Sequence, residues 1–224
     1  MQTASRGSAV VIRLVTVFLA FAAATSLAPT SPAAAEPLRI VALGDSLSAG
    51  YQLPAEAAFP VQLEAALKAR GHEVEVVNAG VSGDTTSGGL ARLDWSVGED
   101  ADAVIVELGA NDALRGLPVA SARSNLEAIV SRLRARGLPV LVAGMRAPRN
   151  LGPDYVEAFD AMFGEIAEAH GALLYPYFLD GIPMSGETVL PDGIHPTAKG
   201  VAIIVEGILP RVEDLIARVR AAKG

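Results

Sequence analysis

The chain has 224 residues, of which 51% are hydrophobic, and its 25 acidic and 18 basic residues give a net charge of −7. This acidic balance argues against a nucleic-acid-binding protein, because neutralising phosphates requires clustered lysine and arginine. The sequence contains no cysteine, which excludes disulfide frameworks, thiolate zinc sites and cysteine nucleophiles, and its apolar content excludes the disordered and fibrous classes.

Residues 1–35 have the pattern of a secretory signal peptide. Arg6 and Arg13 come before an apolar run, 14–27, and small residues lead up to Glu36. A basic start, a short apolar centre and small residues before a break are typical of a leader that is cleaved on export. The run is shorter than the roughly 20 apolar residues that span a bilayer, and an uncleaved membrane anchor is the alternative. We therefore expect residues 36–224 to form one periplasmic or secreted domain without a membrane span.

Short apolar runs without polar alternation predict buried strands in the rest of the chain. They occupy residues 38–43, 74–77, 103–108, 139–143 and 172–175, and in the run 103–108 only Glu107 is charged. Helical patterns cover residues 63–70, 126–133 and 155–169 between these runs. Strands that alternate with helices predict a parallel sheet covered on both faces. The fold class is therefore α/β, a three-layer α/β/α sandwich with a five-stranded, flavodoxin-like sheet.

The last helix is predicted to begin at Pro196, because proline is favoured at the first helical position. Its apolar stripe runs from Val201 to Val219 at steps of three and four residues. Pro210 lies inside this stripe, and it has no N–H to donate along the helix. We expect Pro210 to kink or split the helix.

In sheets of this class, ligands bind outside the carboxyl ends of the strands. Three polar segments follow predicted strands, and a fourth comes just before the last helix: residues 44–51, 78–89, 109–112 and 191–196. We expect all four to lie on one rim of the sheet, which makes them the place to look for chemistry.

The three histidines have different surroundings. His72 and His170 each stand beside a glycine at a helix-to-strand junction, which is typical of a helix end. His195 follows Asp192 by three residues, and a carboxylate that accepts from one imidazole nitrogen leaves the other free as a general base. This pair alone is a weak signal, because surface turns often contain it and the two residues can also ligate a metal. A third metal ligand at a recognisable spacing is missing, so we expect no metal.

Ser46 is the matching nucleophile, because it lies at the turn between the first strand and the next helix. An N-cap serine is the alternative at such a position. A serine nucleophile needs a base, a residue that orients the base, and donors for the oxyanion. One candidate for each lies on a separate loop: His195, Asp192, the backbone N–H of Gly80 and the side-chain amide of Asn111. Their joint occurrence favours catalysis over capping.

These segments resemble the four sequence blocks of the SGNH (GDSL) hydrolase family. The blocks are Gly-Asp-Ser-Leu at 44–47, Gly80, Gly-Ala-Asn-Asp at 109–112 and Asp-Gly-Ile-His at 192–195, in the family's order. The likeness is closest to the exported branch that contains arylesterases, thioesterase I and lysophospholipases. It implies that Ser46 is the nucleophile, that His195 is the base and that Asp192 orients it. It also implies an oxyanion hole made of Gly80, Asn111 and the N–H of Ser46.

The resemblance also bears on two further positions. Ala110 stands where many relatives have a second glycine, and its methyl group is expected to narrow the pocket or shift the loop. Asp45 usually supports the turn in this family, so we interpret it as structural.

Several apolar residues on the rim loops are candidates for contact with a substrate, with ordinary loop packing as the alternative for about half of them. The four selected as substrate-binding are Leu47, Tyr51, Leu114 and Ile194, and the further ones are Leu53, Leu117, Met145, Pro148 and Leu151. Arg115 and Arg146 either meet a negative head group or are solvated.

The resemblance implies a serine hydrolase that cleaves aryl and acyl esters, and that extends to thioesters and lysophospholipids. Its acyl-enzyme forms on Ser46 and needs no cofactor, and its substrate is a small-molecule or lipid ester. A carbohydrate O-acetyl esterase of the same fold is the enzymatic alternative, and an exported binding module is the non-enzymatic one. A nucleotide or flavin protein is disfavoured, because neither a P-loop nor Gly-x-Gly-x-x-Gly is present.

Overall fold

A computed structural model gives the structure of this protein, and it describes residues 1–3, 36–183 and 185–223. The chain divides into two units, Met1–Ala35 and Glu36–Gly224, and the fold below is that of the second unit. The predicted signal peptide lies outside the described residues, apart from its first three positions. In the described part of the chain, no helix is long and apolar enough to cross a membrane.

The centre of the fold is a parallel sheet with the strand order β2-β1-β3-β4-β5. Its strands are β1 (Leu38–Gly44), β2 (Val74–Gly80), β3 (Ala103–Glu107), β4 (Val140–Ala143) and β5 (Leu173–Tyr175). Each predicted apolar run forms a strand, and the predicted fold class is confirmed. After β1 the chain first adds β2 on one side and then β3 on the other. The carboxyl ends of β1 and β3 therefore flank the point where the strand order reverses, which is where such sheets bind ligands.

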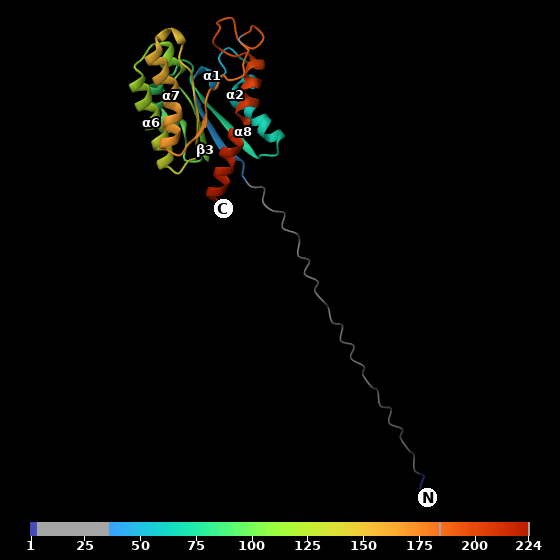
Figure 1. Ribbon diagram of the computed structural model, residues 1–224. Coiled ribbons are helices and arrows are strands. Elements are labelled where there is room, and N and C mark those ends of the chain that lie inside the picture. Colours follow the sequence, from blue (N-terminus) through green and yellow to red (C-terminus); the bar gives the residue numbers. More distant parts are fainter. Residues whose placement is uncertain (4–35, 184, 224) are drawn as a thin grey trace. The chain divides into compact units, whose positions relative to one another are not determined.

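Helices cover both faces of the sheet (Figure 1). One face carries α2 (Phe59–Ala69) and α8 (Ala198–Lys223), and the other carries α6 (Val119–Ala135) and α7 (Pro153–Ala169). Shorter helical segments lie in the loops: α1 (Ser46–Ala49), η1 (Ala55–Ala57), α3 (Thr86–Ala91), α4 (Leu93–Ser96), α5 (Ala110–Leu114) and η2 (Arg149–Leu151). Two of these, α1 and α5, directly follow β1 and β3.

The core between these layers is built from the apolar residues that the runs and helical stripes supply. Every residue of β3 is buried, and Phe59 and Phe178 pack edge to face, as do Phe159 and Phe163. Burying a side chain of this size stabilises the fold by about 1.5–3 kcal/mol. The loops at the carboxyl ends of the strands are thus carried by a rigid sheet.

The last helix differs from the prediction in two ways. It begins at Ala198 rather than at Pro196, because Pro196 pairs with Val189 in an antiparallel bridge and the Thr197 hydroxyl accepts from the N–H of Gly200. The prediction of a split at Pro210 is wrong, since α8 continues through it. Pro210 faces solvent while the neighbouring stripe is buried on both sides of it, so packing holds the helix together across the missing hydrogen bond.

Candidate active site

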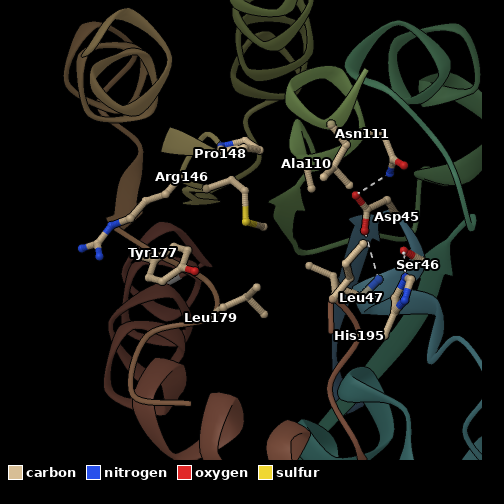
Figure 2. A pocket seen from close by; sticks show the side chains of 13 residues that line it. Asp45, Ser46, Leu47, Ala110, Asn111, Arg146, Pro148, Tyr177, Leu179 and His195 are labelled. Carbon is tan, nitrogen blue, oxygen red and sulfur yellow. Dashed lines mark hydrogen bonds between the residues drawn. The ribbon is translucent and has the colours of Figure 1, made fainter. Parts of the chain in front are cut away.

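Ser46, His195 and Asp192 form a continuous hydrogen-bonded chain (Figure 2). Ser46 begins α1 directly after β1, and His195 lies in the turn before α8, 149 residues further along the chain. The distance between Ser46 Oγ and His195 Nε2 is 2.9 Å, and the distance between His195 Nδ1 and Asp192 Oδ2 is 2.7 Å. This is the arrangement in which an imidazole can take a proton from a hydroxyl while a carboxylate stabilises the resulting cation.

Asp192 also builds the turn that carries His195. Its Oδ1 atom accepts from the backbone N–H groups of Ile194 and His195 at 2.9 and 3.0 Å, and Gly193, which directly follows Asp192, has a φ of 72°. These two N–H groups, with the imidazole, lower the pKa of Asp192 to about 2. Asp192 is therefore an anion throughout the neutral range. The Tyr51 ring packs against the imidazole of His195, with the two ring centroids 4.5 Å apart.

The helix cap at the nucleophile turn comes from Asp45 and not from Ser46. The Oδ1 atom of Asp45 accepts from the N–H of Leu47 at 3.0 Å. The N-cap alternative for Ser46 is therefore wrong, and its hydroxyl is left to meet His195. The N–H of Ser46 meets no acceptor in the described part of the chain, as an oxyanion donor requires.

Asp45 connects the nucleophile turn to Asn111. The side chain of Asp45 is fully buried, and its Oδ2 atom accepts from the Asn111 amide at 2.9 Å, across 66 residues of sequence. Burial raises the pKa of Asp45 to about 6, against the opposing effects of the Leu47 N–H and the Asn111 amide. Our interpretation of Asp45 as structural was incomplete, because its carboxylate also orients a predicted oxyanion donor.

Glu107 lies beneath the same turn. It is fully buried, and its Oε2 atom accepts from the Ser48 hydroxyl at 2.8 Å and from the N–H of Asp45 at 3.3 Å. Its Oε1 atom has no hydrogen-bond partner in the described residues. Burial, together with the nearby Asp45 carboxylate, raises the pKa of Glu107 well above its usual range. In the sequence, the only signal for this residue was that it interrupts an apolar run.

This buried network leaves no room for a side chain at Gly44. A Cβ atom there would lie 2.2 Å from Ser48 Oγ and 2.6 Å from Glu107 Oε2. We expect Gly44→Ala to lower the free energy of unfolding by about 1–3 kcal/mol, because overpacking forces the network apart. Urea denaturation measures the effect. Gly164→Ala in α7 is the control, since its Cβ would meet only ordinary contacts at 3.7 Å and alanine favours a helix. Equal stability of Gly44→Ala and wild type would contradict the packing argument.

The backbone N–H of Gly80 is not free to act as the predicted oxyanion donor. Its N–H donates to Asn78 Oδ1 at 3.0 Å, and Gly80 lines a different cavity, beside Trp95. A Cβ atom at Gly80 would lie 2.3 Å from the Ala49 nitrogen and 2.8 Å from the Asp45 oxygen. Glycine is therefore needed here for the close approach of β2 to α1, and we correct its predicted role to packing.

A second glycine in the same loop has a free backbone donor. The N–H of Gly83 has no acceptor among residues 36–183 and 185–223, and its φ of 84° suits glycine. Arg115, at the end of α5, donates to the Gly83 oxygen at 2.7 Å. This contact ties the loop after β2 to the helix that carries Asn111.

A pocket of about 160 Å³ opens beside Ser46, and apolar side chains line most of it. Of the four predicted substrate-binding residues, Leu47, Leu114 and Ile194 line it, whereas Tyr51 does not and contacts His195 instead. The remaining lining residues are Asp45, Ser46, Ala110, Asn111, Met145, Arg146, Pro148, Tyr177, Leu179 and His195.

Two of these lining residues, Tyr177 and Leu179, are not among those predicted from the sequence. Both follow β5, so the rule that ligands bind at carboxyl ends of strands was sufficient to find them. Figure 2 shows them opposite Ser46 and His195, across the pocket. The guanidinium of Arg146 lies 4.4 Å from the centre of the Tyr177 ring and points away from Ser46. The candidates Leu53, Leu117 and Leu151 do not line the pocket.

The other histidines are not part of this site. His170 is the C-cap residue of α7, and His72 lies beyond the end of α2, with its Nε2 atom 3.3 Å from a carboxylate oxygen of Glu213 on α8. Among the described residues, no group of three or more histidine, aspartate or glutamate side chains is placed to hold a metal ion.

Comparisons with known proteins agree with this geometry. A model of the GDSL-like lipase/acylhydrolase family matches residues 42–203. The chain is 38% identical over 188 residues to the esterase TesA of Pseudomonas aeruginosa, covering 84% of this chain and 92% of the relative. It is 36% identical over 185 residues to the Escherichia coli K12 protein named thioesterase 1/protease 1/lysophospholipase L1, covering 82% and 86%.

A solved structure supports the same relationship. The psychrotrophic esterase EstA from Pseudoalteromonas sp., in a form inhibited by monoethylphosphonate, matches with a TM-score of 0.75 and 32% identity, covering 80% of this chain and 98% of that chain. The matched part of the present chain contains Ser46, Asn111, Asp192 and His195. The chain therefore belongs to the GDSL-like lipase/acylhydrolase family.

Proposed function

We propose that this protein hydrolyses carboxylic esters through an acyl-enzyme on Ser46. The observation that carries the proposal is the chain from Ser46 Oγ through His195 to Asp192, which opens onto a largely apolar pocket. The named relatives are esterases or carry esterase-type activities in their names. A binding module of the same fold has no need for such an aligned nucleophile and base.

In the first half of the reaction, Ser46 Oγ attacks the ester carbonyl and His195 Nε2 takes its proton. The Asp192 carboxylate stabilises the imidazolium through Nδ1–H. When the tetrahedral intermediate collapses, His195 gives the proton to the leaving alkoxide and the alcohol departs. Water then attacks the acyl-enzyme by the same steps in reverse, and releases the acid and free Ser46.

The negative charge that forms on the carbonyl oxygen needs donors that are already in place. We assign this role to the N–H of Ser46, the second amide hydrogen of Asn111 and the N–H of Gly83. The first and third of these groups meet no acceptor in the described residues. The Asn111 amide keeps its orientation because one of its hydrogens is donated to Asp45.

The apolar lining favours acyl or aryl esters as substrates over sugar acetates, because a polar alcohol gains little from Leu47, Leu114 and Leu179. Thioesters and lysophospholipids are included in the proposal, in line with the name of the Escherichia coli relative. Export through residues 1–35 is also part of it, since their pattern is that of a signal peptide.

Covalent labelling combined with a substrate panel tests the proposal. We expect a fluorophosphonate to label the purified protein at Ser46, as a phosphonate inhibits the solved relative. The panel contains p-nitrophenyl acetate, p-nitrophenyl octanoate, an octanoyl thioester and a lysophospholipid, and we expect octanoate to be favoured over acetate. Absence of labelling and of turnover on the whole panel would refute the proposal, and a strong preference for acetyl groups on sugars would support the alternative.

The pH dependence provides a separate prediction, because the Asp45 carboxylate orients the Asn111 amide. Asp45 takes up a proton as the pH falls through about 6, and it then no longer offers a charged acceptor to Asn111. We therefore expect kcat/KM on p-nitrophenyl butyrate to fall as the pH is lowered through about 6. The asparagine of Asp45→Asn cannot titrate, so this variant should have a lower plateau and should lack the part of the acid limb that Asp45 contributes. Identical acid limbs in the two proteins would contradict this role for Asp45.

A further inference from the structure

Arg92 is a nearly buried arginine that contacts the ends of two strands and the loop after β2. It lies between α3 and α4, and its side chain is 9% exposed. One terminal nitrogen donates to the Gly44 oxygen at 2.9 Å, and the other donates to the Ala79 oxygen at 2.8 Å and to the Ser96 hydroxyl at 3.0 Å. Its Nε atom lies 2.6 Å from Asp84 Oδ2. All of the guanidinium nitrogens are therefore in use.

These partners belong to the segments that present the catalytic groups. Gly44 is the last residue of β1 and is followed by Asp45 and Ser46, while Ala79 is the second-to-last residue of β2. Asp84 follows Gly83 in the loop after β2. A planar guanidinium holds several acceptors in fixed directions at once, which an ammonium group cannot do. Arg92 thus determines how the ends of β1 and β2 and the loop around Gly83 lie relative to one another.

Arg92 acts on these segments without reaching the substrate. It does not line the pocket at Ser46, and it lines the separate cavity that contains Gly80 and Trp95. Its pairing with Asp84 neutralises a buried charge that would otherwise be costly. The catalytic mechanism above does not use it, so its effect on turnover has to pass through backbone position.

From these contacts we infer that Arg92 is a positioning residue for the oxyanion hole. It holds the loop that carries the Gly83 N–H against the turn that carries the Ser46 N–H. The two N–H groups can then donate to the same substrate oxygen. This inference rests on the proposed ester hydrolysis. It adds to that proposal a residue outside the four sequence blocks and outside the pocket.

The test compares Arg92→Met with a matched control, Arg134→Met. Arg134 is also partly buried and also donates to two backbone oxygens, those of His170 and Leu138, but it is remote from the four rim loops. Loss of one oxyanion donor costs about 10²–10³-fold in rate. We expect Arg92→Met to lower kcat on p-nitrophenyl butyrate by about 10²-fold with little change in KM. Arg134→Met should keep its kcat, although its melting temperature falls to a similar extent.

A second variant keeps the test valid if Arg92→Met does not fold. Arg92→Lys retains a charge facing Asp84 but cannot serve three carbonyl and carboxylate partners, so its kcat should fall by about tenfold or more with an unchanged acid limb in the pH profile. If either folded Arg92 variant has the kcat of the wild type, the inference about Arg92 is wrong, and the proposed function is unaffected. A wild-type protein that turns over no ester and takes no fluorophosphonate would refute the proposed function, and the inference with it.

Discussion

Replacing Ser46 by alanine is expected to lower kcat for p-nitrophenyl ester hydrolysis by about 10⁶-fold, the size of the loss when a serine protease loses its nucleophile. The Oγ atom that this change removes lies 2.9 Å from the base, and no other hydroxyl in the pocket lining has an imidazole partner. Without it no acyl-enzyme forms, and water must attack the ester directly. What remains is the contribution of the oxyanion hole and of substrate binding.

The same mechanism predicts that the effects of the triad changes do not add up. His195→Ala should be about as slow as Ser46→Ala, and the double variant should be no slower than either, because the three residues act as one unit. Ser131→Ala, at an exposed position on α6, is the matched control and should retain full activity and labelling. Rates are measured with freshly purified variants whose thermal unfolding matches wild type. Residual fluorophosphonate labelling of Ser46→Ala at the wild-type rate would place the nucleophile elsewhere.

The second large effect is expected at Asp192. Asparagine has nearly the same shape, and its Oδ1 atom can still accept from the N–H groups of Ile194 and His195, so the turn should persist. Its amide group, however, presents N–H to His195 Nδ1 where the carboxylate accepted a hydrogen bond. The imidazole then carries its proton on Nε2 and cannot act as a base. We expect kcat to fall by about 10⁴-fold, the size of the effect of this change in a serine protease.

Two comparisons make this result specific to the hydrogen bond. Asp214→Asn, at an exposed ion pair on α8, also removes one surface charge and should leave kcat unchanged. Asp192→Ala also removes the acceptor of the Ile194 and His195 N–H groups, so this variant should have a lower melting temperature than wild type. Asp192→Asn keeps that acceptor and should have the melting temperature of wild type. A fall of less than tenfold in kcat for Asp192→Asn would show that Asp192 does not set the tautomer of His195.

Much of this site was predictable from short stretches of sequence. Ser46 lies within a four-residue block, and Asp192 and His195 are three residues apart on one turn, so local geometry brings the second pair together in any fold. The strands were predictable for a similar reason, because a strand buried on both faces is a nearly continuous apolar run. Their carboxyl-end loops then followed from the parallel arrangement of the sheet.

Gly80 shows where such reasoning fails. A glycine in a polar loop fits either a free backbone donor or a close approach between elements, and the sequence has no means of separating the two. In the structure, a Cβ atom at Gly80 would lie only 2.3 Å from the Ala49 nitrogen, and the Gly80 N–H donates to Asn78. Both observations show that this glycine serves the close approach of two elements. The length of α8 is another example, because buried residues on both sides carry it past Pro210.

The sequence by itself determined the three-layer α/β fold and pointed to Ser46, His195 and Asp192 as candidates for catalysis, because these depend on periodicity and on short sequence blocks. Only the tertiary structure decided what holds these groups in place. Asp45 meets Asn111, Glu107 meets Ser48 and Arg92 meets Gly44, and each of these pairs is between 48 and 66 residues apart in the chain. Hydrogen bonds at such separations depend on how strands and loops pack, and no local pattern encodes them.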